Sequence, residues 1–203
     1  MQFLKKLALV VMRFSSLSFL LCLLSASTVT GFNPNQAKQG PGATTTSRTH
    51  KDITESAVRA MAKLFMDEYP DDYPDQDNTM ASDDFKQAIS HFTTGAARPD
   101  LESHLADVPK VHFDNEEIVE SNQRLIEERQ RVINALNQDD MAGARDLSGQ
   151  LLHTLQDFYS HTNWVENENS GIHPALGDPG ATGNLGTVAT GEEETCSDCR
   201  TET

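Results

Sequence analysis

The sequence predicts an all-α protein, a bundle of helices with disordered segments at both ends of the chain. Apolar residues recur at the three- and four-residue spacing of amphipathic helices, and no segment alternates apolar and polar residues over enough positions to indicate a strand. Gly, Pro, Thr and Asn accumulate in residues 32–48, and Gly and acidic residues accumulate in residues 171–203. Such compositions are typical of segments that bury no core.

The length and charge of the chain limit its function. The 203 residues fit one domain with its tails, and the formal net charge is −15. A protein so acidic is repelled by nucleic-acid phosphates and by anionic membrane surfaces, and no dense basic cluster lies outside the N-terminus. We therefore expect no nucleic-acid partner.

The N-terminus, residues 1–31, has the pattern of a secretory signal peptide. Three Lys and Arg residues precede or flank a short apolar run, residues 17–24, and small residues follow it. The run is too short to span a bilayer, although an uncleaved signal anchor is the alternative. We expect a secreted, extracellular protein without a transmembrane segment, whose mature chain begins with a flexible leader, residues 32–48. Any partner would be extracellular and is unknown.

Four helices are expected, separated where prolines or acidic turns interrupt the apolar spacing. Residues 69–79 form an acidic loop with two prolines, and residues 93–113, with two further prolines, form an ambiguous connection. Asp114 is expected to cap the third helix, because Glu117 occupies the capping-box position. Together the helices make one domain, residues 49–170. They span residues 49–68, 82–92, 115–137 and 141–165.

The last expected helix carries a row of metal-ligand residue types. His153, Asp157 and His161 follow one another at steps of four, which places them on one face of a helix, whereas most Leu residues lie on the opposite face. Neutral imidazoles and a carboxylate are ligands that suit Zn²⁺. The alternative is a solvated polar face in which Asp157 makes ordinary contacts with its helical neighbours.

Further candidates lie outside that helix. His50 stands at the start of the first helix, where a rigid terminus would hold it, although a surface histidine beside a cap is the simpler interpretation. His112 and Asp114 precede the third helix, and capping alone would account for Asp114. The remaining histidines lack a motif and are expected at the surface: His91, His104 and His173.

Two cysteines would remain after removal of the signal peptide. Cys196 and Cys199 form a Cys-x-x-Cys pair close to the C-terminus. The chain has no second such pair and no βαβ pattern, so a thioredoxin-like redox site is not expected. In a secreted protein a disulfide between these two cysteines, or from them to a partner, is possible.

The run Gly149-Gln-Leu-Leu-His153-Thr-Leu-Gln-Asp157-Phe-Tyr-Ser-His161-Thr-Asn-Trp carries a family resemblance. It resembles the N-terminal domains of the von Willebrand factor A domain-containing protein 7 family and the Het-C proteins. More remotely it is similar to the zinc-dependent phospholipase C and S1/P1 nuclease group, which is all-α and binds up to three zinc ions. The resemblance covers about residues 47–170.

The resemblance implies a zinc site. His50 matches the histidine that starts a helix in the phospholipase group, and the segment around His112 resembles another ligand segment. The second His-x-x-x-Glu helix of that group is missing, because Gly177 stands four residues after His173. One or two zinc ions are therefore expected instead of three. The expected metal residues are His50, His112, Asp114, His153, Asp157 and His161.

Two functions follow from these features. The first is a secreted, non-catalytic helical domain with a His/Asp metal-type site. The alternative is a zinc-dependent phosphodiesterase, like a phospholipase C or a nuclease, in which the metal would polarise the phosphoryl group and supply hydroxide. An incomplete product without independent function is a third possibility. No Asp-x-Ser-x-Ser motif follows the helical region, so we expect a truncated form without a von Willebrand factor A domain.

Overall fold

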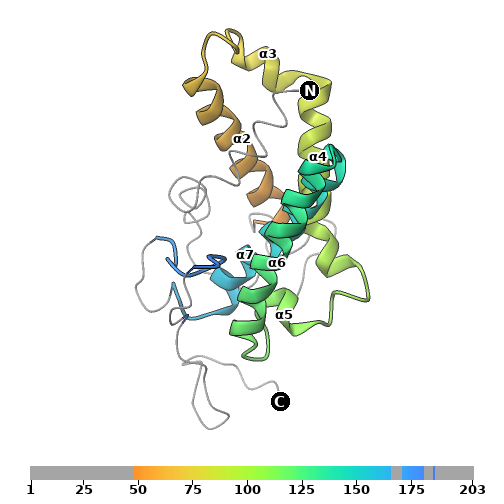
Figure 1. Ribbon diagram of the computed structural model, residues 1–203, viewed down its shortest axis with the longest axis vertical. Helices are drawn as coiled ribbons and strands as arrows, with labels where there is room; N and C mark the ends of the chain where they lie inside the picture. The colour runs from red at the N-terminus through yellow and green to blue at the C-terminus, as the bar shows by residue number, and fades with distance from the viewer. Residues whose placement is uncertain (1–47, 166–170, 181–184, 186–203) are drawn as a thin grey trace.

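The computed structural model describes residues 48–165, 171–180 and 185, and in this part of the chain it contains helices and no strand (Figure 1). The predicted all-α class is confirmed. The expected signal peptide, nearly all of the expected leader and the Cys-x-x-Cys pair lie outside the described residues. The described helices are α2 (His50–Glu68), α3 (Gln76–Ala81), α4 (Asp83–Leu101), α5 (Pro109–His112), α6 (Ile118–Asn137) and α7 (Met141–His161).

Helix α7 is the centre of the bundle. It contacts α2, α4, α5 and α6, while α3 packs on α2 and α4 (Figure 1). One apolar cluster joins α2 to α4 and includes Phe65, Phe85 and Phe92. Another cluster lies around Phe158 of α7 and takes in Leu125 of α6. Burial of apolar side chains in these two clusters supplies most of the driving force for packing the bundle.

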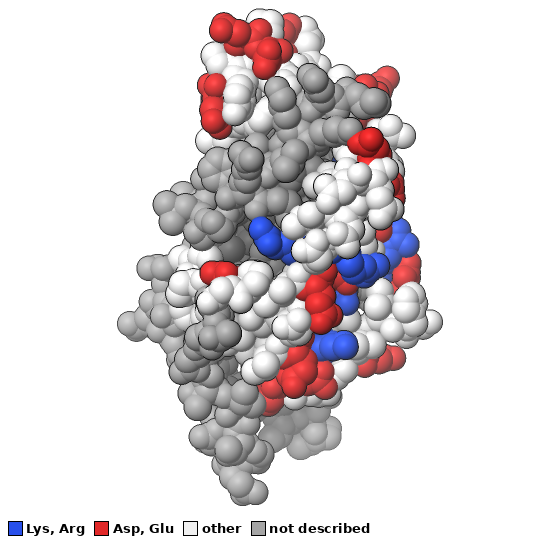
Figure 2. All heavy atoms as spheres, in the orientation of Figure 1, with Lys and Arg blue, Asp and Glu red and all other residues white. Residues whose placement is uncertain are grey.

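The surface agrees with the acidic composition. On the face seen in Figure 2, acidic side chains gather at the end of the molecule formed by α2 and α3, and no continuous basic patch interrupts them. Among the described helices, none has the length and apolar character needed to cross a membrane.

The acidic segment expected to be a loop contains a helix, so that prediction was wrong. The side chain of Asp75 accepts a hydrogen bond from the backbone N–H of Asn78 at 3.1 Å, which caps the first turn of α3. Both prolines of the segment precede this cap, where they do not interrupt helical hydrogen bonds.

The second expected helix is longer than predicted. It was expected to end at Phe92, but α4 continues through Pro99 to Leu101. A proline in the last turn removes only one hydrogen bond, to the carbonyl of Gly95, and packing of α4 along α7 offsets that loss. The extension carries Asp100 into the interior, which decides the composition of the site described below.

The third and fourth helices also depart from prediction at their ends. Asp114 does not cap α6, which begins at Ile118 without a side-chain cap. Phe113, Asn115 and Glu116 have positive φ angles, so the chain turns sharply here instead of entering a helix. Helix α7 ends at His161, four residues before the expected end.

Residues 171–177 pack against α7, which places His173 in the interior. His173 was expected at the surface but is only 5% exposed, because its ring lies 4.5 Å from that of Trp164 and 5.6 Å from that of Phe158. Its Nδ1 accepts a hydrogen bond from the backbone N–H of Ala175. Burial lowers the pKa of His173.

Helices α4 and α7 touch backbone to backbone at two glycines. A Cβ atom on Gly149 would lie 2.2 Å from the carbonyl oxygen of Phe92 and 2.7 Å from the amide nitrogen of Ala96. A Cβ atom on Gly95 would lie 2.1 Å from the carbonyl oxygen of Asp146. No side chain fits at either position without moving one helix away from the other.

Replacing Gly149 by Ala tests this contact. Helix propensity alone would make Gly149→Ala stabilising by about 1 kcal/mol. The overlap with the backbone of α4 should reverse the sign and lower the free energy of unfolding by about 1–3 kcal/mol. Urea unfolding followed by circular dichroism measures the change. Gly180→Ala, whose nearest neighbour is an aspartate side chain at 3.4 Å, is the control; an unchanged or higher stability of Gly149→Ala would contradict the contact.

Acidification should loosen the segment that carries His173. The folded-state pKa lies below the ordinary value of 6.5, so the unfolded state takes up the proton first. The stabilisation by neutral His173 should be complete above pH 6.5 and should be lost as the pH falls through that value toward the folded-state pKa. Trp164, the one tryptophan of the chain, reports on the contact by fluorescence. In His173→Asn the corresponding step should vanish; an identical pH profile in both proteins would contradict the assignment.

Candidate metal centre

Four helices bring five ligand-type side chains to one place. His50 comes from the first turn of α2, Asp100 from the last turn of α4, and His112 from the end of α5. His153 and Asp157 come from the middle of α7. We call these five residues the His/Asp cluster. Its histidines and Asp157 are at most 5% exposed, and the side chain of Asp100 is 23% exposed.

Asp157 lies between the three imidazoles. Its Oδ2 is 2.9 Å from His153 Nε2 and 3.1 Å from His112 Nδ1. Its Oδ1 is 3.3 Å from His50 Nε2. The two oxygens of one carboxylate therefore face different histidines.

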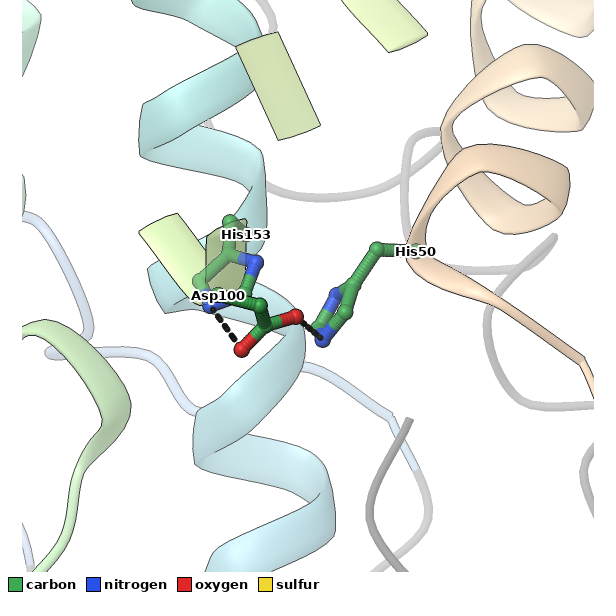
Figure 3. A group of neighbouring side chains, drawn as sticks. All are labelled: His50, Asp100 and His153. Carbon is green, nitrogen blue, oxygen red and sulfur yellow. Dashed lines mark ion pairs between the residues drawn. The ribbon is translucent and has the colours of Figure 1, made fainter. Parts of the chain in front are cut away.

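Asp100 faces the same imidazoles from α4, the helix whose backbone touches that of α7. Its Oδ1 is 3.7 Å from His153 Nε2, and its Oδ2 is 3.7 Å from His50 Nε2 (Figure 3). The same Oδ1 is 3.8 Å from His112 Nδ1. The Oδ2 atom is buried and has no hydrogen-bond partner. A buried carboxylate oxygen in this situation is costly unless a cation lies beside it.

The outward-facing nitrogen of each imidazole is held by a carbonyl oxygen. Such an oxygen only accepts hydrogen bonds, so each of these nitrogens carries the N–H in the neutral ring, and the inward-facing nitrogen presents a lone pair. The pairs are His50 Nδ1 with Gln156 Oε1 (2.7 Å), His112 Nε2 with the Leu105 carbonyl (3.2 Å) and His153 Nδ1 with the Ala96 carbonyl (2.8 Å).

The interior of the cluster is therefore made of acceptors. Three imidazole lone pairs and two carboxylates converge, and His153 Nε2 lies only 3.0 Å from His112 Nδ1. None of these groups brings a donor of its own when the histidines are neutral and the carboxylates ionised. Cations, either protons or metal ions, must lie between them to offset the repulsion.

Protons alone do not offset the repulsion among the acceptors of the cluster. Burial and the neighbouring His153 lower the pKa of His50 to about 3, so His50 stays neutral at physiological pH. Burial opposes protonation of His153 as well, but the carboxylates of Asp157 and Asp100 and the Ala96 carbonyl together outweigh it and raise the pKa of His153. Burial would raise the pKa of Asp157, yet the surrounding imidazoles hold it well below its ordinary value. One proton on His153 leaves the Nε2 lone pair of His50 facing the carboxylates of Asp157 and Asp100.

The donor set fits a metal ion better. Two overlapping groups have ligand atoms within 4.8 Å of one another: His50 with Asp100 and His153, and His112 with His153 and Asp157. Both groups could hold a metal ion. Outer hydrogen bonds from a histidine N–H to a carbonyl oxygen are also the usual way in which metal-binding imidazoles are oriented.

Local structure explains why His50 and His112 point inward. Thr49 and Asp52 form a capping box that fixes the first turn of α2, and His50 lies in that turn. Phe113 follows His112 with φ of 55°, a strained value for a bulky residue. Packing of the Phe113 ring against Phe158 at 5.2 Å holds this conformation and ends α5 at His112.

Of the six residues expected to bind metal, the structure brings four into the cluster: His50, His112, His153 and Asp157. The other two form a pair beside it. His161 Nδ1 lies 2.9 Å from Asp114 Oδ1 and 2.7 Å from the carbonyl oxygen of His112. Neither belongs to the two candidate groups. The face of α7 that carries the row is buried against α4, so the alternative of a solvated polar face is wrong for His153 and Asp157.

Two residues of the site were missed from the sequence. Asp100 fell in the segment taken as a connection after an early helix end, and its only signal was continued helical spacing past Pro99. Gln156 accepts the hydrogen bond from the His50 N–H. No pattern in the sequence pointed to this role, because glutamine belongs to no metal-ligand motif.

Comparison with known proteins places this domain in a family. Residues 46–203 match the VWA7 N-terminal domain. Human von Willebrand factor A domain-containing protein 7 is 33% identical over 172 residues, and the rat protein is 31% identical over 172 residues. The matches cover 74% of this chain but 19% of each relative, so the chain spans a minor part of their length. No solved structure matches the chain, and the expected similarity to the phospholipase C fold stays a prediction. The chain belongs to the family of von Willebrand factor A domain-containing protein 7 N-terminal domains.

Proposed function

We propose that this chain is a secreted, non-catalytic helical domain whose His/Asp cluster binds zinc, and that the metal locks α2, α4, α5 and α7 together. The observation that carries the proposal is the convergence of acceptors without donors in the buried cluster. Imidazole nitrogens with one or two carboxylate oxygens are a donor set that zinc prefers. Calcium and magnesium, which favour all-oxygen sites, fit it poorly.

The arrangement of the carboxylates supports two ions. Asp157 directs one oxygen toward His50 and the other toward His112 and His153. Asp100 divides its oxygens in the same way at longer distances. Each carboxylate can thus serve both candidate groups at once.

Burial supports a structural role for the metal. Catalytic zinc sites keep a position open for water or substrate, whereas structural sites are closed by protein ligands. Only the side chain of Asp100 among the cluster residues is appreciably exposed, at 23%. The net charge of −15 also disfavours the binding of anionic phosphodiesters.

The extracellular location rests on the sequence of residues 1–31, which lie outside the described residues. A signal peptide of this pattern would deliver the domain to an oxidising compartment, where a Cys196–Cys199 disulfide is possible. An extracellular partner of unknown identity belongs to the same proposal.

A phosphodiesterase is the second candidate, and Asp100 is the observation that favours it. Its Oδ2 is buried without a hydrogen-bond partner, while the Asp100 side chain as a whole is 23% exposed, more than any other side chain of the cluster. Burial raises the pKa of Asp100, which suits a carboxyl that takes up and releases a proton. Bound zinc would supply polarisation of a phosphoryl oxygen there.

Metal content tests the proposed function. The purified chain should contain about two zinc ions, one for each candidate group, when measured by elemental mass spectrometry. The His153→Ala/Asp157→Ala double variant removes a shared histidine and the central carboxylate, and should contain none. His104→Ala, at a side chain that is 73% exposed, is the matched control and should bind as the unchanged chain does. A folded, metal-free protein after growth and purification with zinc would contradict the proposal.

Chelation should lower stability if the role is structural. Removing the metal leaves a buried acceptor cluster, and a ligand present at 100 times its dissociation constant contributes about 2.7 kcal/mol. We expect a chelator to lower Tm by several degrees and zinc to restore it, as measured by thermal unfolding. A zinc-loaded protein whose Tm is unchanged by chelation would show that the metal does not hold the helices together.

Hydrolysis of bis(p-nitrophenyl) phosphate separates the two candidates. The non-catalytic domain should show no turnover above zinc in buffer. Turnover by the zinc-loaded chain that is lost in Asp100→Asn, with zinc content retained, would overturn the non-catalytic role and favour the phosphodiesterase.

A further inference from the structure

Gln156 connects the cluster to the side of α2 that faces α7. It lies on α7 directly before Asp157 and is 1% exposed. Its Nε2 donates a hydrogen bond to Thr54 Oγ1 at 2.9 Å, and its Oε1 accepts one from His50 Nδ1 at 2.7 Å. Thr54, one turn along α2 from His50, is fully buried as well.

The direction of the Gln156 amide decides which nitrogen of His50 carries the proton. With Oε1 toward His50, the proton is on Nδ1 and the lone pair of Nε2 points at Asp157 and Asp100. With the amide reversed, its N–H₂ group would face Nδ1. The proton would then move to Nε2, where it would donate to Asp157 Oδ1 at 3.3 Å and block ligation.

The other two histidines of the cluster are held differently. Their outer acceptors are backbone carbonyls, of Leu105 and Ala96, which the fold orients and which cannot reverse. A side-chain amide has no such constraint, because it presents a donor at one end and an acceptor at the other. At the far end of the amide, the Thr54 hydroxyl accepts the hydrogen bond from Nε2 and anchors the side chain between α7 and α2. His50 is therefore the cluster histidine whose tautomer depends on a side-chain hydrogen bond.

We propose that Gln156, anchored at its far end by Thr54, is a positioning residue that keeps His50 in the Nδ1–H tautomer and so makes Nε2 available as a ligand. The inference rests on the proposed metal function for its consequence, but its first step concerns the metal-free protein. Gln156 itself does not contribute a ligand, because its Oε1 is engaged with the far side of the His50 ring.

The test compares three variants by two measurements. Long-range ¹H–¹⁵N correlation spectra of the metal-free protein report the tautomer of His50, and competition with a chromogenic chelator reports zinc affinity. Gln156→Met keeps the volume but removes the acceptor. It should shift His50 to the Nε2–H tautomer and lower zinc affinity by about 10–100-fold, the usual loss on removing an outer-shell partner. Gln156→Glu keeps an acceptor and should retain the tautomer and most of the affinity.

Gln150→Met, at a partly exposed glutamine of α7 bonded to Asp146, is the matched control and should change neither measurement.

The outcomes separate the two proposals. If the unchanged chain binds no zinc but Gln156→Met shifts the His50 tautomer, the proposed function fails and the positioning role stands. If folded Gln156→Met keeps both the Nδ1–H tautomer and the zinc affinity, the positioning role is overturned.

Discussion

The close contact of α4 and α7 at Gly95 and Gly149 determines the rest of the structure. Because no Cβ atom separates the two backbones, the Ala96 carbonyl comes within 2.8 Å of His153 Nδ1. The same approach brings Asp100, one turn further along α4, opposite the imidazoles of the cluster. A wider spacing would leave His153 without its outer acceptor and Asp100 out of reach. The two glycines thus link the packing of the bundle to the chemistry of its interior.

The cluster makes the interior of this small domain unusually polar. Buried carboxylates and imidazoles are unfavourable unless they are paired, and every inward-facing group here is an acceptor. At the edges of the same site, Phe113 has a strained, positive φ angle and a proline lies within α4. These features are understandable if bound cations offset their combined cost, and they make little sense as the core of a helical bundle without them.

The sequence predicted the site better than it predicted the ends of the helices. The steps of four from His153 to Asp157 place both residues on one face whatever the tertiary structure, so local geometry sufficed for them. Capping of α2 at Thr49 fixed His50 in the same local way. Asp114 was wrongly expected to cap α6, because its place in the chain depends on three positive φ angles and on contact with His161, and neither feature has a local sequence signal.

Asp100 and Gln156 could not be found for a related reason. Pro99 normally indicates a helix end, and only packing against α7 reveals that α4 continues past it. The amide of Gln156 acquires its role from Thr54 and His50, which lie about a hundred positions away in the chain. Residues whose function is to orient another residue across a helix interface require the three-dimensional structure.

The most direct test of the account is a crystal structure of the zinc-loaded chain with anomalous diffraction measured on both sides of the zinc absorption edge. The account predicts zinc peaks inside the His/Asp cluster, about 2.0–2.1 Å from His153 Nε2 or His50 Nε2, with the outer hydrogen bonds of all three histidines preserved. Peaks confined to the surface, with His153 and His112 hydrogen-bonded directly to Asp157, would contradict it.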